Sequence, residues 1–574
     1  MRRFLYGACA LLTLPALLVG LGEMVFIDDE GIRSVVALEM LWSGNYVAPT
    51  IHGDAYLNKP PLWNWVLALS FTLFGGASEF AARLPTVLCV LGFAATAFAF
   101  SRRYLPTYLA FVHAMTVVTC GRMLFWDSML ALIDVCFSWV VYTQIMVLFH
   151  FGRRGQWWWA FLLSYLLTAT GFMLKNLPAL VFQGLTVLAL LGFTRSWRQF
   201  FRLPHLVSGL LCVGLLSVYL AAYHQYVPLD VLFERLFVES GKRTAAAHTP
   251  GETLAHVLAF PFEMSYHFLP WTLLLVFLPL GRRRVWRDDF LRWCLLAFAV
   301  NLPVYWLSPN VYPRYLLMLF PLLFAPLLVL YQEAPWAGPQ GQGKMKYYLT
   351  CLLFGAMCVV TVGLPFVPLI PETEIVTYRW VKALLPCGPA LLLCRLAWRD
   401  IRVGRGRNFL LLFTCFLLLL RLVFNFFVLP PRAAGDERGQ AVRSTAYAVA
   451  AQARDRDLRV YAHSPVEPAT SFYLTQARGC LVPRQFTGFD STSYYVTATP
   501  TYKTVTVTAA TDSLYLRHQR LFYPVGPLTR PAPVADSLRD PLRDGMGTGI
   551  LLTFAACTSP SSSPSTTSAK TSGR

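Results

Sequence analysis

The chain has 574 residues, of which 56% are hydrophobic and only 14% are charged, and its formal net charge is +19. A soluble domain usually carries about 25% charged residues. This composition therefore excludes an ordinary soluble protein and predicts a protein embedded in a membrane.

Apolar runs long enough to cross a bilayer recur along the chain up to residue 429. A membrane span needs about 20 apolar residues, and this rule predicts about thirteen transmembrane helices. Residues 62–76 are apolar but too few for a span, so we interpret them as an interfacial or re-entrant segment. The predicted spans lie near residues 4–27, 79–101, 104–121, 129–150, 157–174, 177–194, 204–226, 267–281, 290–307, 315–332, 347–370, 380–397 and 409–429.

Lys and Arg residues gather in alternate loops, as the positive-inside rule requires of cytoplasmic loops. The pairs Arg2-Arg3, Arg102-Arg103 and Arg153-Arg154 all fall on one side of the predicted bundle. This pattern places the N-terminus in the cytoplasm. It also explains the positive net charge as a topology signal, which argues against nucleic-acid binding.

The first apolar run has a second interpretation, a cleaved signal peptide. No convincing small-x-small cleavage site precedes Asp28 and the run is long, so we interpret it as an uncleaved span. The cysteines lie mainly inside predicted spans, where cysteine behaves as a small apolar residue. No CxxC spacing typical of a metal site is present.

Charged residues concentrate in the loop after the first span. Asp28, Asp29 and Glu30 lie where hydrocarbon gives way to headgroups, and carboxylates there are costly unless they serve a function. The next residues mix apolar and polar side chains, which predicts a short helix along the membrane surface. The loop ends in the sequence from Asn58 to Pro61, where two prolines hold Lys59 on stiff, non-helical backbone.

Further polar residues occupy the later outer loops. Asp127 and Asp134 are separated by about two helical turns, so both side chains point the same way if the segment is one helix. We expect the loop around residues 308–315 to cap the same cavity as the first loop. The other outer-loop residues of interest are Arg122, Lys175, Arg243, His248, Tyr312, Arg314 and Tyr315.

The hydropathy falls after Leu429, where we expect a second domain on the outer side of the membrane. Its alternating β-branched and aromatic residues and its helical stretches predict a small α/β domain. Helices are expected near residues 445–453 and 469–475, and strands near 458–462 and 494–508. The predicted units are a transmembrane module at 1–429 with interfacial helices in 28–78, the α/β domain at 430–557, and a disordered Ser/Thr/Pro-rich tail at 558–574. Cys480 and Cys557 are a candidate pair for an oxidising compartment.

The N-terminal motifs also carry a family resemblance. They are Asp29-Glu30, Glu39-Met40-Leu41, Ser43-Gly44, Pro49, Gly53, Lys59-Pro60-Pro61 and the run from Phe80 to Pro85. This pattern resembles bacterial transferases related to lipid A aminoarabinose transferase and to protein O-mannosyltransferases. The resemblance is clearest over residues 20–330. It implies the GT-C class, an α-helical polytopic fold in the bacterial inner membrane with a periplasmic C-terminal domain. It further implies inverting sugar transfer from a polyprenyl-phosphate donor to an outer-side acceptor, which is lipid A, another glycolipid or a protein.

Such a reaction needs a carboxylate that positions the acceptor and takes its proton. The resemblance makes Asp29 the predicted base, with Asp28 and Glu30 as substitutes. A competing interpretation is that Asp29 caps a helix N-terminus. Asp127 is the second candidate acid and Asp134 competes with it, whereas a buried ion pair would explain both without catalysis.

The reaction also needs cations for the leaving phosphate. Lys59 is the first candidate, followed by Arg243, Lys175 and Arg122. Snorkelling of the side chain to headgroups, or contact with anionic lipid, is the competing interpretation for these cations. We expect Asp134, Tyr312, Arg314 and Tyr315 to line the acceptor side of the cavity.

We predict no required metal or other cofactor. In some relatives, outer-loop histidines and a glutamate before the Lys-Pro-Pro motif bind zinc, but here that position is Asn58. His248 alone does not make a metal site. A second departure is Asn176, where relatives usually carry glycine.

Two other functions are open to a membrane protein of this kind, a transporter or flippase of lipid-linked sugars and an assembly scaffold. A transporter keeps ionisable residues near mid-bilayer and often shows repeated halves. Here the charges gather on one face and no repeat is visible. A scaffold leaves the three acids unexplained. The predicted partners are therefore a polyprenyl-phosphate-linked sugar, a lipid or protein acceptor, and the bilayer.

Overall fold

The computed structural model describes residues 1–241, 248–279, 281–336, 342–454, 457–461, 467–485, 494–498, 520–522 and 550–554. The chain divides into two compact units. The membrane module comprises residues 1–51 and 55–436, and the C-terminal unit comprises residues 52–54 and 437–574. The division at residue 436 lies near the predicted boundary at 430, and the inclusion of residues 52–54 in the second unit has no counterpart in the prediction.

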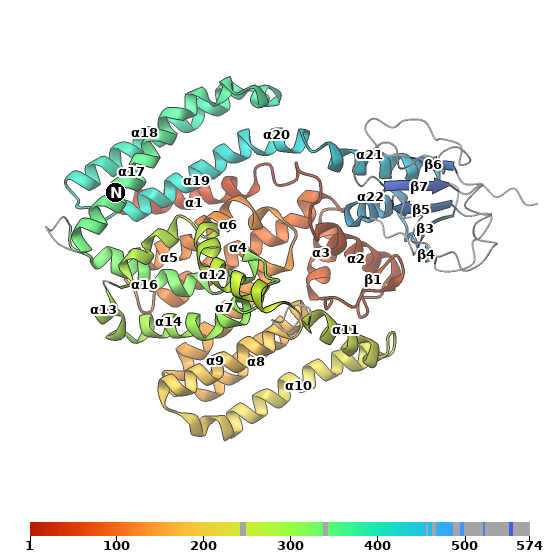
Figure 1. The fold of residues 1–574 in the computed structure, drawn as a ribbon, viewed down its shortest axis with the longest axis horizontal. Helices are drawn as coiled ribbons and strands as arrows, with labels where there is room; N and C mark the ends of the chain where they lie inside the picture. The colour runs from red at the N-terminus through yellow and green to blue at the C-terminus, as the bar shows by residue number, and fades with distance from the viewer. Residues whose placement is uncertain are drawn as a thin grey trace, which may run out of the picture. The chain divides into compact units, whose positions relative to one another are not determined.

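The membrane module is built almost entirely of helices (Figure 1). Those of its first half are α1 (Arg2–Leu18), α2 (Glu30–Ser43), α3 (Leu62–Leu73), α4 (Glu79–Ser101), α5 (Thr107–Thr119), α6 (Gly121–Phe125), α7 (Ile133–Gly152), α8 (Trp157–Lys175), α9 (Pro178–Thr194) and α10 (Leu203–His224). The second half contains α11 (Leu229–Gly241), α12 (Pro250–His267), α13 (Arg282–Trp286), α14 (Asp289–Asn301), α15 (Pro303–Trp306), α16 (Phe320–Glu333), α17 (Gln342–Gly363), α18 (Arg379–Arg402), α19 (Phe409–Phe427) and α20 (Leu429–Ala434). Short 3-10 helices are η1 (Asp127–Met129), η2 (Trp197–Phe201), η4 (Trp271–Phe277), η5 (Pro313–Leu316), η6 (Leu364–Leu369) and η7 (Pro371–Ile375), and two short strands are β1 (Thr50–Ile51) and β2 (Asp54–Ala55).

The polytopic α-helical architecture predicted from composition is confirmed. In the described part of the chain, seven helices are long and apolar enough to span a membrane, namely α4, α7, α8, α10, α17, α18 and α19 with their extensions. A bent pair, residues 107–119 and 121–129, adds an eighth if its 48° bend lies within one span. Shorter apolar helices are α3, α9 and α16.

Six of the thirteen predicted spans are not among these seven long helices of the described chain, and three of the six show where a helix ends early or breaks. The first helix, α1, ends at Leu18, before Gly20 takes a positive φ of 74°. The span expected at 267–281 contains the short 3-10 helix η4. The span expected at 290–307 is divided between α14 and α15 at Pro303, whose ring carries no N–H for a helical hydrogen bond. Hydropathy alone did not register these breaks.

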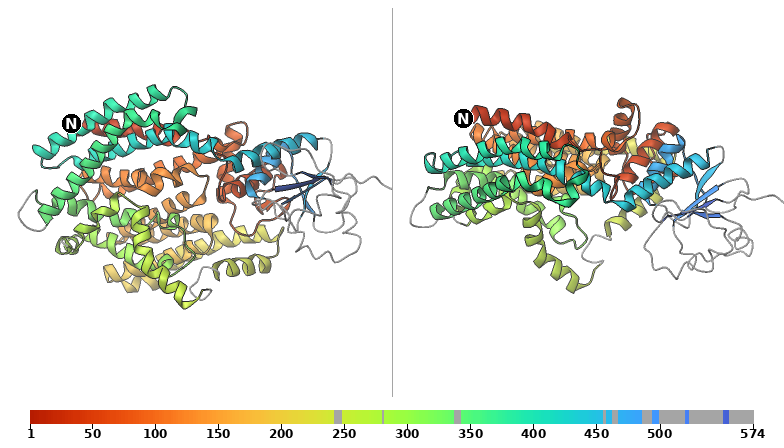
Figure 2. Two further views of the ribbon diagram at one scale, coloured as in Figure 1. Left: turned by 45° about the horizontal axis from the view of Figure 1, so that its top comes forward. Right: turned by 90° about the horizontal axis from the view of Figure 1, so that it is seen from above.

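The ends of buried helices are tied together by polar side chains from α19. Arg421 in α19 is 1% exposed, and its Nε donates to the carbonyl of Ala16 in α1 at 3.1 Å. Its Nη1 donates to the carbonyl of Leu124 in α6, and Asn425 also donates to Ala16 at 2.9 Å. Carbonyls at helix C-termini lack partners within their own helix. These bonds therefore satisfy buried acceptors where three helices meet. Helices α17, α18 and α19 run beside one another in the further views (Figure 2).

The C-terminal unit is a small α/β unit, as predicted. Its helices are α21 (Glu437–Gln452) and α22 (Pro468–Arg478), which pack against each other. Its sheet has the strand order β4-β3-β5-β7-β6, with β3 parallel to β4 and β5, and the β5-β7-β6 part antiparallel. The strands are β3 (Leu458–Tyr461), β4 (Arg484–Gln485), β5 (Tyr494–Ala498), β6 (Arg520–Phe522) and β7 (Ile550–Phe554). The predicted strand 494–508 is seen as β5, and its remainder lies outside the described residues. The tail at 558–574 and Cys557 also lie outside them, and Cys480 is exposed.

His52 belongs to the C-terminal unit and is 2% exposed. Its Nδ1 lies 3.0 Å from the carbonyl of Val482, and its Nε2 lies 2.8 Å from the hydroxyl of Ser471. Burial lowers the pKa of His52 to about 4. The ring is therefore neutral at physiological pH.

Candidate active site

Two of the three consecutive acids form ion pairs with arginines distant in sequence. Asp28 has a φ of 55°, and its carboxylate accepts a hydrogen bond from Nη1 of Arg314. Glu30 is fully buried and accepts from Nε and Nη2 of Arg83 at 2.8 and 2.9 Å, from the N–H of Ala131 at 2.8 Å and from the N–H of Ile27 at 3.0 Å. Both carboxylates therefore join the first loop to segments that are distant in the sequence.

Asp29 lies between these two ion pairs and is the most exposed of the three acids. It occupies the N-cap position of α2, but its side chain makes no capping hydrogen bond. Its side chain is 47% exposed, and Oδ2 lies 3.8 Å from Nη2 of Arg33, one helical turn along α2. The predicted alternative role as a helix cap is thus not seen in the structure.

The surface helix predicted after the acids is α2, which packs against α3 and buries most of its residues. Arg33 is therefore not on a surface: its side chain is 4% exposed and donates from Nη1 to the hydroxyl of Tyr56 at 2.8 Å. Burial raises the pKa of Tyr56, although the charge of Arg33 opposes the shift. This arrangement keeps the guanidinium in place beside Asp29.

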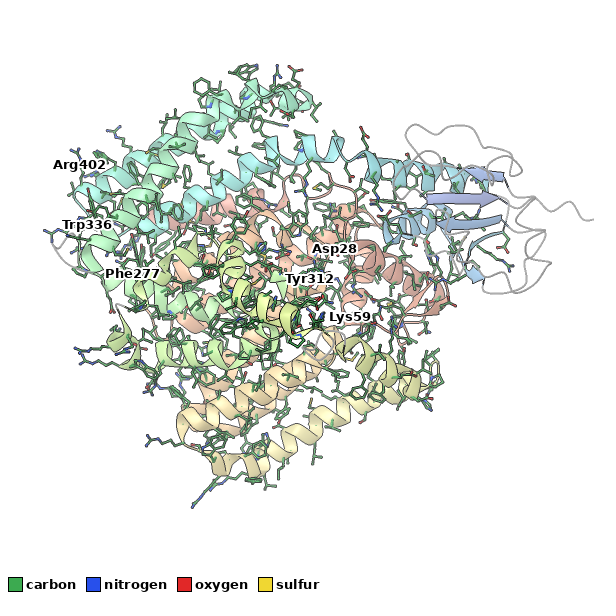
Figure 3. All side chains as sticks on the ribbon, in the orientation of Figure 1. Asp28, Lys59, Phe277, Tyr312, Trp336 and Arg402 are labelled. Atoms are coloured by element: carbon green, nitrogen blue, oxygen red, sulfur yellow. The ribbon has the colours of Figure 1, made fainter. Side chains whose placement is uncertain are left out.

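One cavity of about 430 Å³ joins the first loop to later parts of the membrane module. Asp29 and Lys59 both line it, as does Lys175 from the end of α8. Its apolar wall includes Ile32, Leu177, Val181, Leu236 and Val304, and its polar lining includes Asp29, Arg33, Tyr56, Asn58, Lys59, Lys175 and Glu239. Asp28, Lys59 and Tyr312 are labelled near the middle of the module in Figure 3. The structure thus brings the predicted base and the predicted phosphate cation to one cavity.

Alternating charges extend from the cavity wall into the protein. Lys175 donates from Nζ to Asp134, and its Nζ lies 3.6 Å from the ring centroid of Tyr315. Asp134 also lies 3.4 Å from Nε of Arg314, whose other nitrogen binds Asp28. Burial alone would lower the pKa of Arg314, but Asp134 and Asp28 hold it above its usual value. This network, from Lys175 through Asp134 and Arg314 to Asp28, connects the cavity to the acidic loop.

The guanidinium of Arg314 lies 4.4 Å from the ring of Tyr312, and Tyr315 lines the cavity. The 308–315 loop therefore contributes to this site, as its position in the sequence suggested. Lys59 lines the same cavity as Lys175 and Tyr315. Asn176, next to Lys175, has a φ of 63°, a backbone conformation that favours glycine and that other residues rarely adopt.

Asp127 and Asp134 do not lie on one helix, so the condition under which both side chains would point the same way is not met. Asp127 begins η1, Asp134 lies in α7, and residues 130–132 between them include extended backbone at Leu130 and Leu132. Asp127 is buried and accepts from Nε of Arg122 at 2.9 Å. Asp134, not Asp127, is the acid that binds the cavity residue Lys175.

The described residues do not fit a zinc site. The side-chain oxygen of Asn58 accepts from Arg235 at 3.2 Å, and Arg235 pairs with Glu239 at 3.2 Å. A guanidinium beside this position is a poor neighbour for a metal cation. His248 lies 3.9 Å from Glu252, and no group of three metal-ligating side chains is found within the described ranges. Arg243 lies outside the described residues.

A second cavity, of about 400 Å³, lies among α12, α14, α16 and η4. Its wall is almost wholly apolar and includes Phe260, Met264, Leu275, Phe298, Trp306 and Phe320. The short helix α15 borders both cavities, because Val304 and Tyr305 line the charged one and Trp306 lines the apolar one. A charged cavity and an apolar cavity are therefore separated by one short helix.

Sequence reasoning did not identify Arg33, Tyr56 or Arg235 as site residues. Arg33 lies four residues after Asp29, and Tyr56 lies three residues before Lys59. Helical spacing from Asp29 was the one available signal for Arg33. Arg33 and Tyr56 are 23 residues apart in the sequence, so no local sequence pattern indicates their contact.

Comparison with known proteins gives matches to glycosyl transferases. Residues 58–221 match the family model described as dolichyl-phosphate-mannose-protein mannosyltransferase. The undecaprenyl phosphate-alpha-4-amino-4-deoxy-L-arabinose arabinosyl transferase of Edwardsiella ictaluri is 28% identical over 327 residues, which cover 54% of this chain and 55% of that protein. The corresponding transferase 1 of Pseudomonas fluorescens is 27% identical over 309 residues, covering 51% of each chain. The chain thus spans about half the length of the curated relatives it matches.

The fold has a solved counterpart over nearly its whole length. ArnT from Cupriavidus metallidurans, bound to undecaprenyl phosphate, superposes with a TM-score of 0.63 at 15% identity, covering 96% of this chain and 98% of that one. The predicted family resemblance is confirmed. The apo form of the same ArnT gives a TM-score of 0.61. The fold is therefore the one seen in ArnT, and the apolar helices make the chain a multi-pass membrane protein.

Proposed function

We propose that this protein is an integral-membrane glycosyltransferase that moves a sugar from a polyprenyl-phosphate donor to an acceptor on the outer side of the inner membrane. The observation that carries the proposal is that Asp29 and Lys59 line one cavity. The first supplies a carboxylate, and the second supplies a cation. These are the two groups that such a transfer requires.

In this reaction an acceptor oxygen attacks the anomeric carbon of the sugar from the face opposite the phosphate. The new carbon–oxygen bond forms as the bond to the phosphate oxygen breaks, and the bonding electrons leave with the phosphate. Asp29 takes the proton of an acceptor hydroxyl, or positions the acceptor where it is itself a phosphate. The attack from the opposite face inverts the anomeric configuration.

Lys59 is the cation assigned to the donor phosphate. Prolines at 60 and 61 restrict its backbone in the free protein. Binding of the donor therefore costs little further conformational entropy at this position. Lys175 already binds Asp134 and is assigned a secondary role. Arg243 is a further proposed cation on the family pattern. We assign the apolar cavity beyond α15, of about 400 Å³, to the first isoprene units of the donor tail.

The relatives and the solved structure support this donor class, because their names specify undecaprenyl phosphate. Lipid A, another glycolipid and a protein remain the three acceptor classes. Export of lipid-linked sugars without transfer is the competing function. The charges assembled around one cavity favour the transferase, since a transporter needs its ionisable groups along a path through the membrane.

The decisive variant is Asp29→Asn, assayed as purified protein in nanodiscs with a polyprenyl-phosphate-linked sugar. Loss of the general base should lower kcat by about 10²–10⁴-fold, while binding of the polyprenyl-phosphate donor should persist. Glu23→Gln, at an exposed acid on the preceding segment, is the matched control. Normal turnover by the Asp29 variant would refute the mechanism. Mass spectrometry of lipid A, other glycolipids and periplasmic proteins from cells with and without the gene would identify the acceptor.

A further inference from the structure

A cluster of arginines lies outside the proposed active site, where α4 and α7 end. Arg103 follows α4 and Arg154 follows α7, and both are exposed. Arg103 Nη1 lies 2.6 Å from Nε2 of His150, and Arg154 Nη1 lies 2.7 Å from the same nitrogen. Two guanidinium groups therefore converge on one imidazole nitrogen.

That nitrogen cannot satisfy both arginines. A neutral imidazole has one acceptor nitrogen with a single in-plane lone pair. The other nitrogen, Nδ1, lies 2.8 Å from the hydroxyl of Tyr104, so the lone pair at Nε2 is shared by two donors at best. If Nε2 instead carried the proton, it would accept from neither. In either tautomer, at least one guanidinium donor at this position needs another acceptor.

The neighbouring carboxylate is already engaged. Asp289 pairs with Arg153 and with Arg292, each at 2.9 Å. Neither Arg103 nor Arg154 has a carboxylate within 4 Å among the residues that the structure describes. Two like charges that approach this closely repel each other, and an anion between them would remove the repulsion.

The surroundings indicate that the anion belongs to the membrane surface. Helices α7 and α8 both qualify as membrane spans, and the chain turns between them at residues 153–156. Trp158 and Trp159 at the start of α8 are 52% and 55% exposed. Exposed tryptophans at a span end are typical of the headgroup region, and basic pockets between spans bind anionic headgroups.

We propose that Arg103 and Arg154 form a binding site for the phosphate group of an anionic phospholipid headgroup. Guanidinium groups bind phosphate oxygens through paired hydrogen bonds, and two of them can hold one phosphate from either side. Both guanidinium groups lie within 2.7 Å of Nε2 of His150, which places them close enough together to share one phosphate. Favourable interaction with helix C-termini would explain each arginine separately, but it gives no reason for both to point at one nitrogen.

The test compares nanodiscs of phosphatidylcholine alone with nanodiscs that also contain phosphatidylglycerol. The readouts are the thermal unfolding midpoint and the number of phosphatidylglycerol molecules retained in native mass spectrometry. The variants are Arg103→Gln, Arg154→Gln and the double variant. Arg102→Gln is the matched control, because Arg102 is an exposed arginine of the same turn whose guanidinium lies 5.9 Å from the ring of Phe98. Sugar transfer by each variant reports that the protein is folded.

Phosphatidylglycerol should raise the midpoint of the wild-type protein and of Arg102→Gln. Each substitution in the site should weaken retention of phosphatidylglycerol by about tenfold, as expected for loss of a charge-assisted hydrogen bond. A midpoint shift produced by inorganic phosphate in the neutral nanodiscs would support the phosphate site and assign it to free phosphate. Equal midpoints in all conditions, or an equal loss in Arg102→Gln, would overturn the proposal.

Discussion

Replacement of Glu30 by glutamine distinguishes a structural acid from a catalytic one. Glu30 is fully buried and binds Arg83, whose side chain is 2% exposed. Glutamine preserves the size of the side chain but leaves the charge of Arg83 buried without its counter-ion. Breaking a buried pair on one side costs about 3–5 kcal/mol. We therefore expect the free energy of unfolding to fall by about that amount.

The measurement is denaturant unfolding in mixed micelles, combined with kcat per folded molecule. Glu30→Gln should unfold more readily, while the molecules that remain folded should keep most of their kcat, because Glu30 does not line the cavity. Glu23→Gln is the control, since an exposed substitution usually changes stability by less than about 0.5 kcal/mol. Wild-type stability together with lost turnover would refute this reasoning and restore Glu30 as a catalytic acid.

Three further outcomes are expected. Asp28→Asn should lower kcat by up to about 10²-fold with little change in the KM for donor, because asparagine tolerates the positive φ but loses the ion pair with Arg314 and so misplaces Asp29. If Asp28→Ala changed kcat and KM to the same extent, that result would argue against a positioning role. Lys59→Ala should lower kcat/KM by about 10²–10³-fold, with Lys59→Arg retaining more activity, in steady-state assays with the phosphate-linked donor. The C-terminal unit should lose stability as pH falls from 6.5 towards 4, by up to about 3 kcal/mol, because unfolded His52 binds a proton more readily than the buried ring with its pKa of about 4. Hydrogen exchange in residues 471–482 measures this loss, and His52→Gln should flatten it.

The acidic triplet and the Lys-Pro-Pro motif could be recognised in the sequence. Which of the three carboxylates faces the cavity could not. Membrane-edge carboxylates and paired prolines are visible as local patterns. The partners that orient the acids are not local, since Arg83 is 53 residues from Glu30 and Arg314 is 286 residues from Asp28. Only the fold shows that the middle acid faces the cavity. This is why Asp28 and Glu30 were predicted as substitutes for Asp29.

The break between Asp127 and Asp134 also had no sequence signal, because residues 128–133 contain neither proline nor glycine. Hydrogen bonds from other elements stabilise the non-helical backbone between these two residues. The carbonyl of Leu130 accepts from Thr86 at 2.8 Å, the N–H of Ala131 binds Glu30 at 2.8 Å, and the carbonyl of Ala131 accepts from Trp63 at 3.2 Å. Backbone groups that would otherwise continue a helix are thus satisfied by side chains from other elements. Periodicity within the segment cannot reveal such partners.

The charge network also suggests how the cations divide their roles during transfer. A sugar phosphodiester carries one negative charge, whereas the released polyprenyl phosphate carries about −1.5 to −2, so negative charge grows as the bond breaks. Lys59 can meet the charge of the donor at binding. Lys175 can turn towards the additional charge only if Asp134 keeps another partner, and Arg314 at 3.4 Å is that partner. Arg314 also binds Asp28, next to Asp29, so one guanidinium contacts both the partner of Lys175 and the neighbour of the proposed base.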